Sequence, residues 1–272
     1  MFILPLPLLI GLGFLTGIYG TLVGLGGGVV LIPALILLWP EANPATITGI
    51  SLAIVFVNVL SGTLAYARQR RIDYRTGGLF AVATIPGAVL GVLVTQLLNR
   101  QLFSLIFGFL LLLLSVFLQL RPKPRGNRQP SLTGSSSRTV TDAWGETFVY
   151  HFNRSLGIAL SFIVGFIAGL LGIGGGIVHV PAMIYLLNFP IHIATATSHF
   201  ILVFTSLTAS LTHVAEGTYT HYWQLLLWLA VGVIPGAQLG AWLSRRIHGI
   251  LIVRLLALAL TVTGVRLLML AF

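Results

Sequence analysis

Two short stretches of this chain combine closely spaced glycines with a proline. The first reads GLGGGVVLIPA over residues 24–34, and the second reads GIGGGIVHVPA over residues 172–182. Glycines at this spacing interrupt a helix, and the helix that restarts after them has N–H groups without intrahelical acceptors. The positive end of its dipole lies at the same place, so such a start binds anions. Two such starts aimed at one point would hold a negative solute without a buried arginine.

The same glycines could serve packing alone, because small residues let membrane helices approach closely. The duplication, the triple glycine, and the proline at the matching position (Pro33 and Pro181) favour a binding site. A nucleotide-phosphate loop does not fit, because no strand precedes the glycines and no Gly-Lys-Ser/Thr follows them. The residues that we expect to contact the anion through their backbone are Gly26, Gly27, Gly28, Gly174, Gly175 and Gly176.

Six polar side chains stand in apolar stretches from which they could reach the same anion. Each also has an ordinary structural alternative, because hydroxyl groups cap helices or bond to carbonyls, and amides bond between helices. These six candidate ligands are Thr48, Ser51, Asn58, Thr197, Ser198 and Gln238.

His179 and His199 are the ionisable residues deepest in the apolar stretches. Neutral histidines bonded to a carbonyl are common, yet ionisable groups inside a membrane mark functional sites, and histidine titrates near neutral pH. No Asp or Glu falls in an apolar stretch. If a coupling proton is carried, these histidines are its expected carriers. No acid accompanies a deep histidine and no HExxH pair occurs, so we expect no enzyme, no metal site and no other cofactor.

The composition is that of a membrane protein. Of the 272 residues, 57% are hydrophobic and 7% are charged, whereas soluble domains carry about 25% charged residues. There is no cysteine, which excludes thiol chemistry. The formal charge of +10 fits basic loops on the cytoplasmic side of a membrane better than nucleic-acid binding, since no basic helix or aromatic platform accompanies it. We therefore expect an all-α polytopic membrane protein, embedded in the lipid bilayer.

The apolar segments form two groups of five around a polar, basic stretch. Residues 1–120 are expected to be a first transmembrane repeat, 121–154 a mobile cytoplasmic linker, and 155–272 a second repeat. The first segment lacks a preceding basic residue and a cleavage site, so it is expected to remain as a helix. The segments are 6–23, 27–39, 47–67, 77–98, 101–120, 155–172, 176–187, 193–214, 222–243 and 250–271.

Three ordered matches relate the two halves at a nearly constant offset. The glycine stretches match at 148 residues, Asp73-Tyr74 falls on His221-Tyr222 at the same offset, and IPGAxLG at residue 85 returns at residue 234. Ala-Thr-Ile-Thr at residue 45 also resembles Ala-Thr-Ala-Thr at residue 194. We interpret the chain as two repeats of about five segments, each with a short or broken helix headed by glycine.

Charge indicates how the repeats are oriented. The basic loop at 68–75, the central linker and Arg245-Arg246 are expected inside, and the loops at 40–46 and 214–221 outside. If the short segments cross, each half crosses five times, the repeats are inverted and both termini lie outside. If the short segments dip in and return, each half crosses four times and 245–249 is placed outside. The first count fits the charges, although twelve or thirteen apolar residues give only about 20 Å of helix.

The glycine motifs resemble those of the TauE/SafE family of sulfite and organosulfonate exporters. The resemblance covers nearly the whole chain apart from the linker, and it includes the Thr/Ser-rich helix starts at 46–51 and 194–199 and the PGAxxG helices. It implies transport of small anions, often containing sulfur, across the inner membrane. It does not fix the substrate. His179 stands where the first copy has Leu31, so the two copies need not be equivalent.

The expected function is therefore export of a small anion, such as sulfite or a sulfonate, by alternating access between two glycine-headed helices. The alternatives that the sequence leaves open are a passive anion channel, a non-transporting membrane scaffold and a carrier of neutral or cationic solutes. The absence of a deep Asp or Glu argues against cations. The oligomeric state, the coupling ion and the direction of transport are not fixed by the residues.

Overall fold

The computed structural model describes residues 5–39, 42–120, 135–219, 222–247 and 249–269. Within these ranges the chain forms ten helices and one antiparallel β-hairpin, and seven helices are long and apolar enough to cross a membrane. The expected polytopic helical architecture is confirmed. The elements are α1 Leu6–Val23, α2 Gly28–Leu38, α3 Pro44–Arg68, α4 Tyr74–Thr95, α5 Arg100–Leu120, β1 Ser135–Thr141, β2 Thr147–Asn153, α6 Arg154–Leu171, α7 Gly176–Tyr185, α8 Ile191–Ala215, α9 Trp223–Ser244 and α10 Gly249–Met269.

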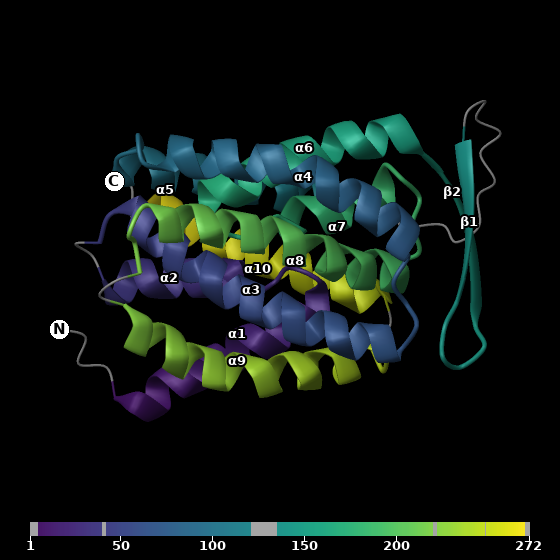
Figure 1. The fold of residues 1–272 in the computed structure, drawn as a ribbon, viewed down its shortest axis with the longest axis horizontal. Coiled ribbons are helices and arrows are strands. Elements are labelled where there is room, and N and C mark those ends of the chain that lie inside the picture. Colours follow the sequence, from purple (N-terminus) through teal and green to yellow (C-terminus); the bar gives the residue numbers. More distant parts are fainter. Residues whose placement is uncertain (1–4, 40–41, 121–134, 220–221, 248, 270–272) are drawn as a thin grey trace.

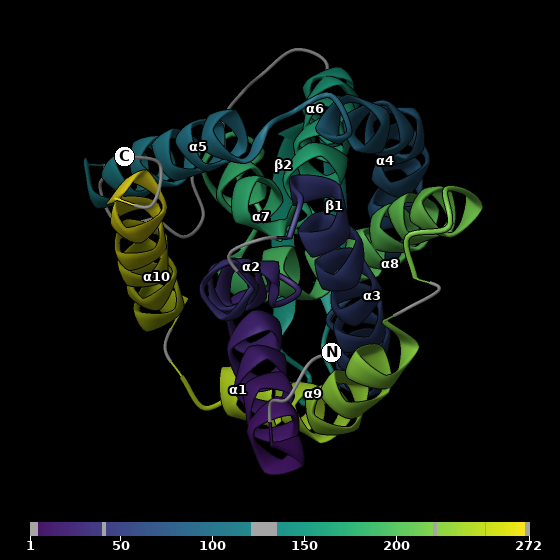
Figure 2. The ribbon, with the colours of Figure 1, turned by 90° about the vertical axis from the view of Figure 1, so that its left-hand side faces the viewer.

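The long helices run roughly along the long axis of the molecule, so the bundle has two ends (Figure 1). The hairpin end carries β1 and β2 together with the loops 69–73, 186–190 and 245–247. The terminal end carries the loops 96–99 and 216–219 and the start of α3, and α1 begins and α10 ends there. Figure 2 views the bundle from the terminal end and shows α1 beside α9, α4 beside α6, and α5 beside α10.

Glycines let two pairs of parallel helices approach closely. In the α1–α9 pair, a Cβ added at Gly236 would lie 2.3 Å from the carbonyl oxygen of Phe14. In the α4–α6 pair, a Cβ added at Gly87 would lie 2.2 Å from the carbonyl oxygen of Phe162. Contacts this short leave no room for any side chain, which is the packing role that small residues have between membrane helices.

The short helices α2 and α7 fold back and do not cross the bundle. α1 starts at the terminal end, because it runs parallel to α9, and α2 returns to that end, where Trp39 contacts Tyr222. α6 starts at the hairpin end directly after β2. α7 returns there, where the following loop brings Phe189 onto Tyr150 of β2.

Five crossings in each half would require α2 and α7 to span the bilayer. Helices of 11 and 10 residues extend only about 16 Å at 1.5 Å per residue, which is too short to span a bilayer. Among the described residues, the seven helices long and apolar enough to cross are instead α1, α3, α4, α5, α6, α8 and α9. The start of α1 and the end of α10 lie at one end of the bundle, opposite the hairpin (Figure 1).

Within the expected linker 121–154, residues 135–153 form a β-hairpin that the sequence analysis did not predict; residues 121–134 lie outside the described ranges. Its strands pair from Ser135 with Asn153 to Thr141 with Thr147. The ring of Tyr150 is buried, and its hydroxyl donates to Asp73 at 2.7 Å. This bond fixes the hairpin to the loop that precedes α4.

A buried ion pair joins the tip of the hairpin to the bundle. Arg71 donates from Nε and Nη2 to Asp142, whose other oxygen accepts the backbone N–H groups of Trp144 and Glu146. Burial acts to raise the pKa of Asp142, but these N–H donors and the Arg71 guanidinium outweigh it and hold the pKa below its ordinary value.

We predict that acid loosens the hairpin. Because the pKa of Asp142 is lowered in the folded protein, its stabilising effect is complete above about pH 4, the ordinary pKa of aspartate, and is lost as the pH falls through the lowered value. Hydrogen exchange of residues 135–153, corrected for the intrinsic rate, measures this. Asp142→Asn should cost roughly 2 to 3 kcal/mol of local opening free energy at pH 7 and remove the acid dependence. Equal protection of the unmodified protein at pH 3 and pH 7 would contradict the prediction.

Candidate functional site

The two glycine turns, residues 24–27 and 172–175, touch each other in the middle of the chain's fold. A Cβ added at Gly176 would lie 2.4 Å from the carbonyl oxygen of Gly24, and a Cβ added at Gly28 would lie 2.7 Å from Cα of Ile173. Gly24, Gly28, Gly172 and Gly176 are all buried. Each turn therefore packs directly on the helix start that follows the other.

Both short helices begin with the same backbone geometry. The residue that precedes α2 is Gly27, with φ 91° and ψ −12°, and the residue that precedes α7 is Gly175, with φ 90° and ψ −11°. These left-handed conformations favour glycine over any residue with a side chain. In the described chain the N–H groups of Gly28, Val29, Gly176 and Ile177 donate no hydrogen bond, as expected for helix starts without a capping side chain.

An apolar cluster fills the space against both turns. A Cβ added at Gly26 or at Gly174 would lie within 3.0 Å of the Val55 side chain, and Leu202 packs against the same two glycines. Val55, Val59 and Leu202 form one buried cluster between α3 and α8. The described conformation is therefore closed at the glycine turns.

Asn58 is the polar side chain beside the start of α2. It is fully buried, and its Oδ1 accepts the hydroxyl of Thr21 at 2.8 Å. Its Nδ2 has no hydrogen-bond partner in the described chain and would be 3.1 Å from a Cβ added at Gly27. A buried amide donor without an acceptor costs about 1–3 kcal/mol, and this one lies beside the unpaired N–H groups of a helix start.

The four serines and threonines expected to bind the anion, at the starts of α3 and α8, contact different parts of the structure. Ser51 donates to the carbonyl of Gly172 at 2.7 Å, and Thr48 packs against Gly172 while bonding to the carbonyl of Ala45. Ser198 is buried, and its hydroxyl has no partner in the described chain. Thr197 lies farther toward the hairpin end, where its hydroxyl accepts the N–H of Asp73.

Gln238 and the two deep histidines lie away from the glycine turns. Gln238 donates to the carbonyl and hydroxyl of Ser61, which joins α9 to α3. His179 lies beside Phe80, with Nε2 3.4 Å from the hydroxyl of Ser161. His199 is fully buried between Gly62 and Tyr66, and neither ring nitrogen has a hydrogen-bond partner in the described chain.

Sequence reasoning missed Thr195, which lies against Gly24 as Thr48 lies against Gly172. The alignment of Ala-Thr-Ile-Thr with Ala-Thr-Ala-Thr paired Thr48 with Thr197 at an offset of 149. The contacts pair Thr48 with Thr195 at an offset of 147. The connections 39–43 and 186–190 are equally long. The shift arises because α7 has 10 residues and α2 has 11, so that α8 starts one residue earlier than a constant offset of 148 would place it.

The chain matches one family model and several membrane proteins over most of its length. The family model described as sulfite exporter TauE/SafE matches residues 9–267. The chain is 37% identical over 266 residues to the probable membrane transporter protein YunE of Bacillus subtilis strain 168, with 96% of each chain covered. It is 24% identical over 259 residues to a probable membrane transporter protein of Methanocaldococcus jannaschii, with 90% of this chain and 89% of the relative covered. No solved structure matches the chain.

Proposed function

Because this chain belongs to the sulfite exporter TauE/SafE family of membrane transporters, we propose that it exports a small anion, such as sulfite or a sulfonate, across the inner membrane. The resemblance drawn from the glycine motifs is confirmed, and the protein is a multi-pass transporter and not an enzyme. The substrate, the direction and the mechanism below are proposals.

The observation that carries the proposal is the contact between the glycine turns beside Nδ2 of Asn58, which has no hydrogen-bond partner among the described residues. Two helix starts and one buried amide donor provide partial positive charge without a fixed cation. We propose that the backbone N–H groups of Gly27, Gly28 and Gly174–Gly176 hold the anion. The N–H of Gly26, expected to contribute, instead donates to the carbonyl of Gly20 at 3.2 Å.

Asn58 and Ser198 are the side-chain donors closest to hand, because neither has a partner for its donor group among the described residues. Ser51 would have to release the carbonyl of Gly172 before it could donate to the anion. Thr48 contributes through packing, and Thr197, Gln238 and His179 are structural.

The helix contacts support the proposal that the halves are inverted repeats. Gly17 of α1 faces the carbonyl of Val233, and Gly165 of α6 faces that of Thr84. These pairs correspond at the offsets of 148 and 149 found in the sequence. Gly87 with Phe162 corresponds to Gly236 with Phe14 in the same way. With α3–α5 crossing in the first half and α8–α10 in the second, each half crosses an odd number of times and the second half has the opposite orientation.

The distribution of charge supports a cytoplasmic hairpin end. Cytoplasmic loops of membrane proteins are enriched in Lys and Arg. The terminal end carries Arg100, Arg266 and Glu216 among the described residues. Among the same residues, the hairpin end carries three acids, Asp73, Asp142 and Glu146, but many more basic residues: Arg68, Arg70, Arg71, Arg75, Arg138, Arg154, Arg245 and Arg246.

Alternating access requires that the closed centre opens to one end at a time. Movement of α3 against α8 would withdraw Val55 and Leu202 from the turns and free the N–H groups for the anion. The parallel pairs α1–α9 and α4–α6 are closely packed through glycine and are expected to move as units. His199, a fully buried ionisable side chain, is the candidate for a coupling proton.

Uptake of radiolabelled sulfite into proteoliposomes tests the function. We expect saturable uptake that sulfonates compete with and that unlabelled internal sulfite accelerates by counterflow. A channel would give unsaturable flux without counterflow. A carrier of neutral or cationic solutes would not respond to sulfite, and a scaffold would give no flux with any solute of the panel. Each of these three results would contradict the proposal.

A further inference from the structure

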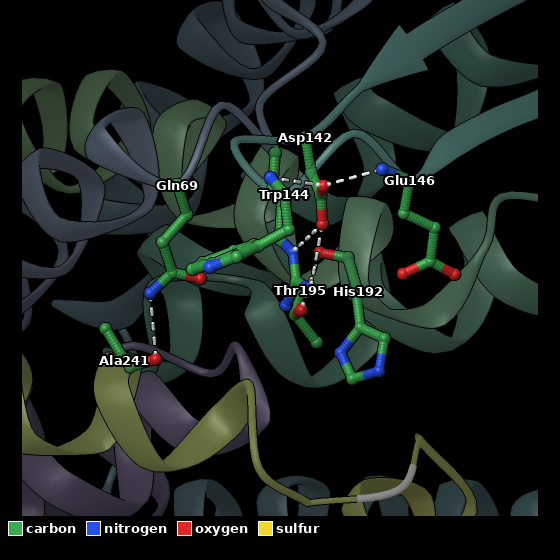
Figure 3. A network of polar contacts seen from close by, with 8 residues as sticks. Gln69, Asp142, Trp144, Glu146, His192, Thr195 and Ala241 are labelled. Atoms are coloured by element: carbon green, nitrogen blue, oxygen red, sulfur yellow. Dashed lines mark hydrogen bonds and ion pairs between the residues drawn. The ribbon is translucent and has the colours of Figure 1, made fainter.

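A second site with positive charge lies at the hairpin end, apart from the glycine turns. A pocket of about 330 Å³ opens there between the tip of the hairpin and the end of α9. Figure 3 shows the hairpin residues Asp142, Trp144 and Glu146 meeting the ends of the helices that carry Gln69 and Ala241. The residues that line the pocket are Arg71, Asp142, Trp144, Glu146, Arg245 and Arg246.

Arg71 has donor capacity that its ion pair does not use. Its side chain is 7% exposed, and its Nε and Nη2 bind Asp142, but its Nη1 has no hydrogen-bond partner in the described chain. The charge of Asp142 is already offset by Arg71 and by two backbone N–H groups. The negative charge of Asp142 therefore does not neutralise the positive charges of Arg245 and Arg246, the other two arginines of the pocket.

Arg245 and Arg246 are held by aromatic rings. Arg245 stacks over Trp144 at 5.6 Å, and Arg246 stacks over Trp242 at 3.9 Å. Among the described residues, no carboxylate pairs with either guanidinium. Stacking fixes the plane of a guanidinium and leaves its N–H edge free, which is the arrangement that binds planar oxyanion edges through two parallel hydrogen bonds.

We propose that this pocket is an anion-capture site, which holds a small oxyanion at the hairpin end before it reaches the glycine turns. The role of the site in transport rests on the proposed function. Binding of the anion to the pocket does not depend on transport. Arg245 and Arg246 are the ligands, Trp144 and Trp242 position them, and Arg71 supplies the buried charge behind them.

The pocket at the opposite end of the bundle has a different character. It measures about 380 Å³ and is lined by polar and apolar residues, with Glu216 and no Arg or Lys among them. An anion is therefore attracted at the hairpin end and not at the terminal end. We expect a lower KM for the anion when it is supplied from the hairpin end than from the terminal end.

Glu146 opposes binding in this pocket. Among the described residues it forms no ion pair, and like Asp142 it lines the pocket. Its carboxylate repels an anion that the three arginines attract. Removing its charge in Glu146→Gln should tighten binding about threefold, which is the scale of one partly screened charge at the surface.

Fluorine NMR of the full chain tests the proposal. The protein has five tryptophans, so labelling with 5-fluorotryptophan gives five signals, and Trp144→Phe identifies that of Trp144. Sodium sulfite is titrated at constant ionic strength maintained with sodium gluconate. We expect a saturable shift of the Trp144 signal, weakened about tenfold in Arg245→Gln and in Arg246→Gln, tightened in Glu146→Gln, and unchanged in Asn58→Leu.

The result also separates this site from the proposed function. A saturable Trp144 shift in a protein that gives no sulfite flux would sustain the capture site and overturn the transport proposal. A Trp144 signal that does not move, or that moves equally in Arg245→Gln and in the unmodified protein, would overturn the capture site even if transport is normal.

Discussion

Substituting aspartate for Asn58 is expected to reduce sulfite transport at least about 100-fold at pH 8. Asn58 is fully buried beside Gly27, where the anion is proposed to bind. Two unit charges about 5 Å apart repel each other by about 3 kcal/mol at an effective dielectric constant of 20. The Thr21 hydroxyl, which already donates to Oδ1, would also stabilise the carboxylate. The introduced charge would thus occupy the position of the substrate.

Two further variants separate the effect of the introduced negative charge on transport from the effect of losing the Nδ2 donor. Asn58→Leu keeps the volume and removes the Nδ2 donor, so transport should fall about tenfold, the value of one hydrogen bond to a charged group. Thr205→Val is the control, because the hydroxyl of Thr205 is already bonded to Thr84 and to the carbonyl of Ile201. We expect less than a threefold effect there. Normal sulfite uptake by folded Asn58→Asp would contradict the assignment of Asn58.

Substituting alanine for Gly176 is expected to destabilise the protein and to abolish transport together. The added Cβ would lie 2.4 Å from the carbonyl oxygen of Gly24, and backbone atoms cannot yield as a flexible side chain does. The two glycine turns must then separate. Overpacking of this kind costs about 1–3 kcal/mol, which thermal unfolding in detergent measures. Gly28→Ala, whose Cβ would meet the backbone of Ile173 at 2.7 Å, should behave in the same way.

A matched alanine variant separates crowding from the loss of glycine itself. Gly78 lies in α4, and a Cβ added there would have no atom within 4 Å. Alanine is favoured over glycine in a helix by about 0.5–1 kcal/mol, so Gly78→Ala should unfold at the same or a higher temperature and transport normally. If Gly176→Ala is as stable and as active as Gly78→Ala, the two turns do not need their close contact.

Several elements follow directly from local residue patterns. α1 was expected at 6–23 and is Leu6–Val23, because an apolar run ends at a glycine that adopts the left-handed conformation. α3 begins after Asn43, whose side chain accepts the N–H of Thr46, and α4 begins after Asp73 in the same manner. Apolar length and capping residues suffice for these bounds.

The direction of the short helices could not be predicted from the same patterns. Hydropathy does not distinguish a short crossing helix from one that folds back, because both are apolar throughout. The fold-back of α2 depends on Gly24, Gly26 and Gly27, which all adopt positive φ angles. The sequence shows that these glycines permit a turn. Only the packing of α2 against α1 and α3 determines its angle.

The hairpin and the capture site were missed for a different reason. The polar composition of residues 121–154 indicated a linker, yet Phe148, Tyr150 and Phe152 alternate with polar residues as in a half-buried strand. That alternation was the available signal. Arg71, Trp144 and Arg245 are far apart in the chain and come together only when the hairpin docks, so no local pattern relates them.

The most direct test of the account is whether a transported anion contacts the amides of the glycine turns. Solid-state NMR of 15N-glycine-labelled protein in lipid bilayers, titrated with sulfite, measures this. We predict saturable shifts of the Gly27, Gly28, Gly175 and Gly176 amides with a Kd close to the transport KM, and loss of these shifts in Asn58→Asp. Shifts confined to other glycines, while sulfite transport saturates normally, would contradict the central claim.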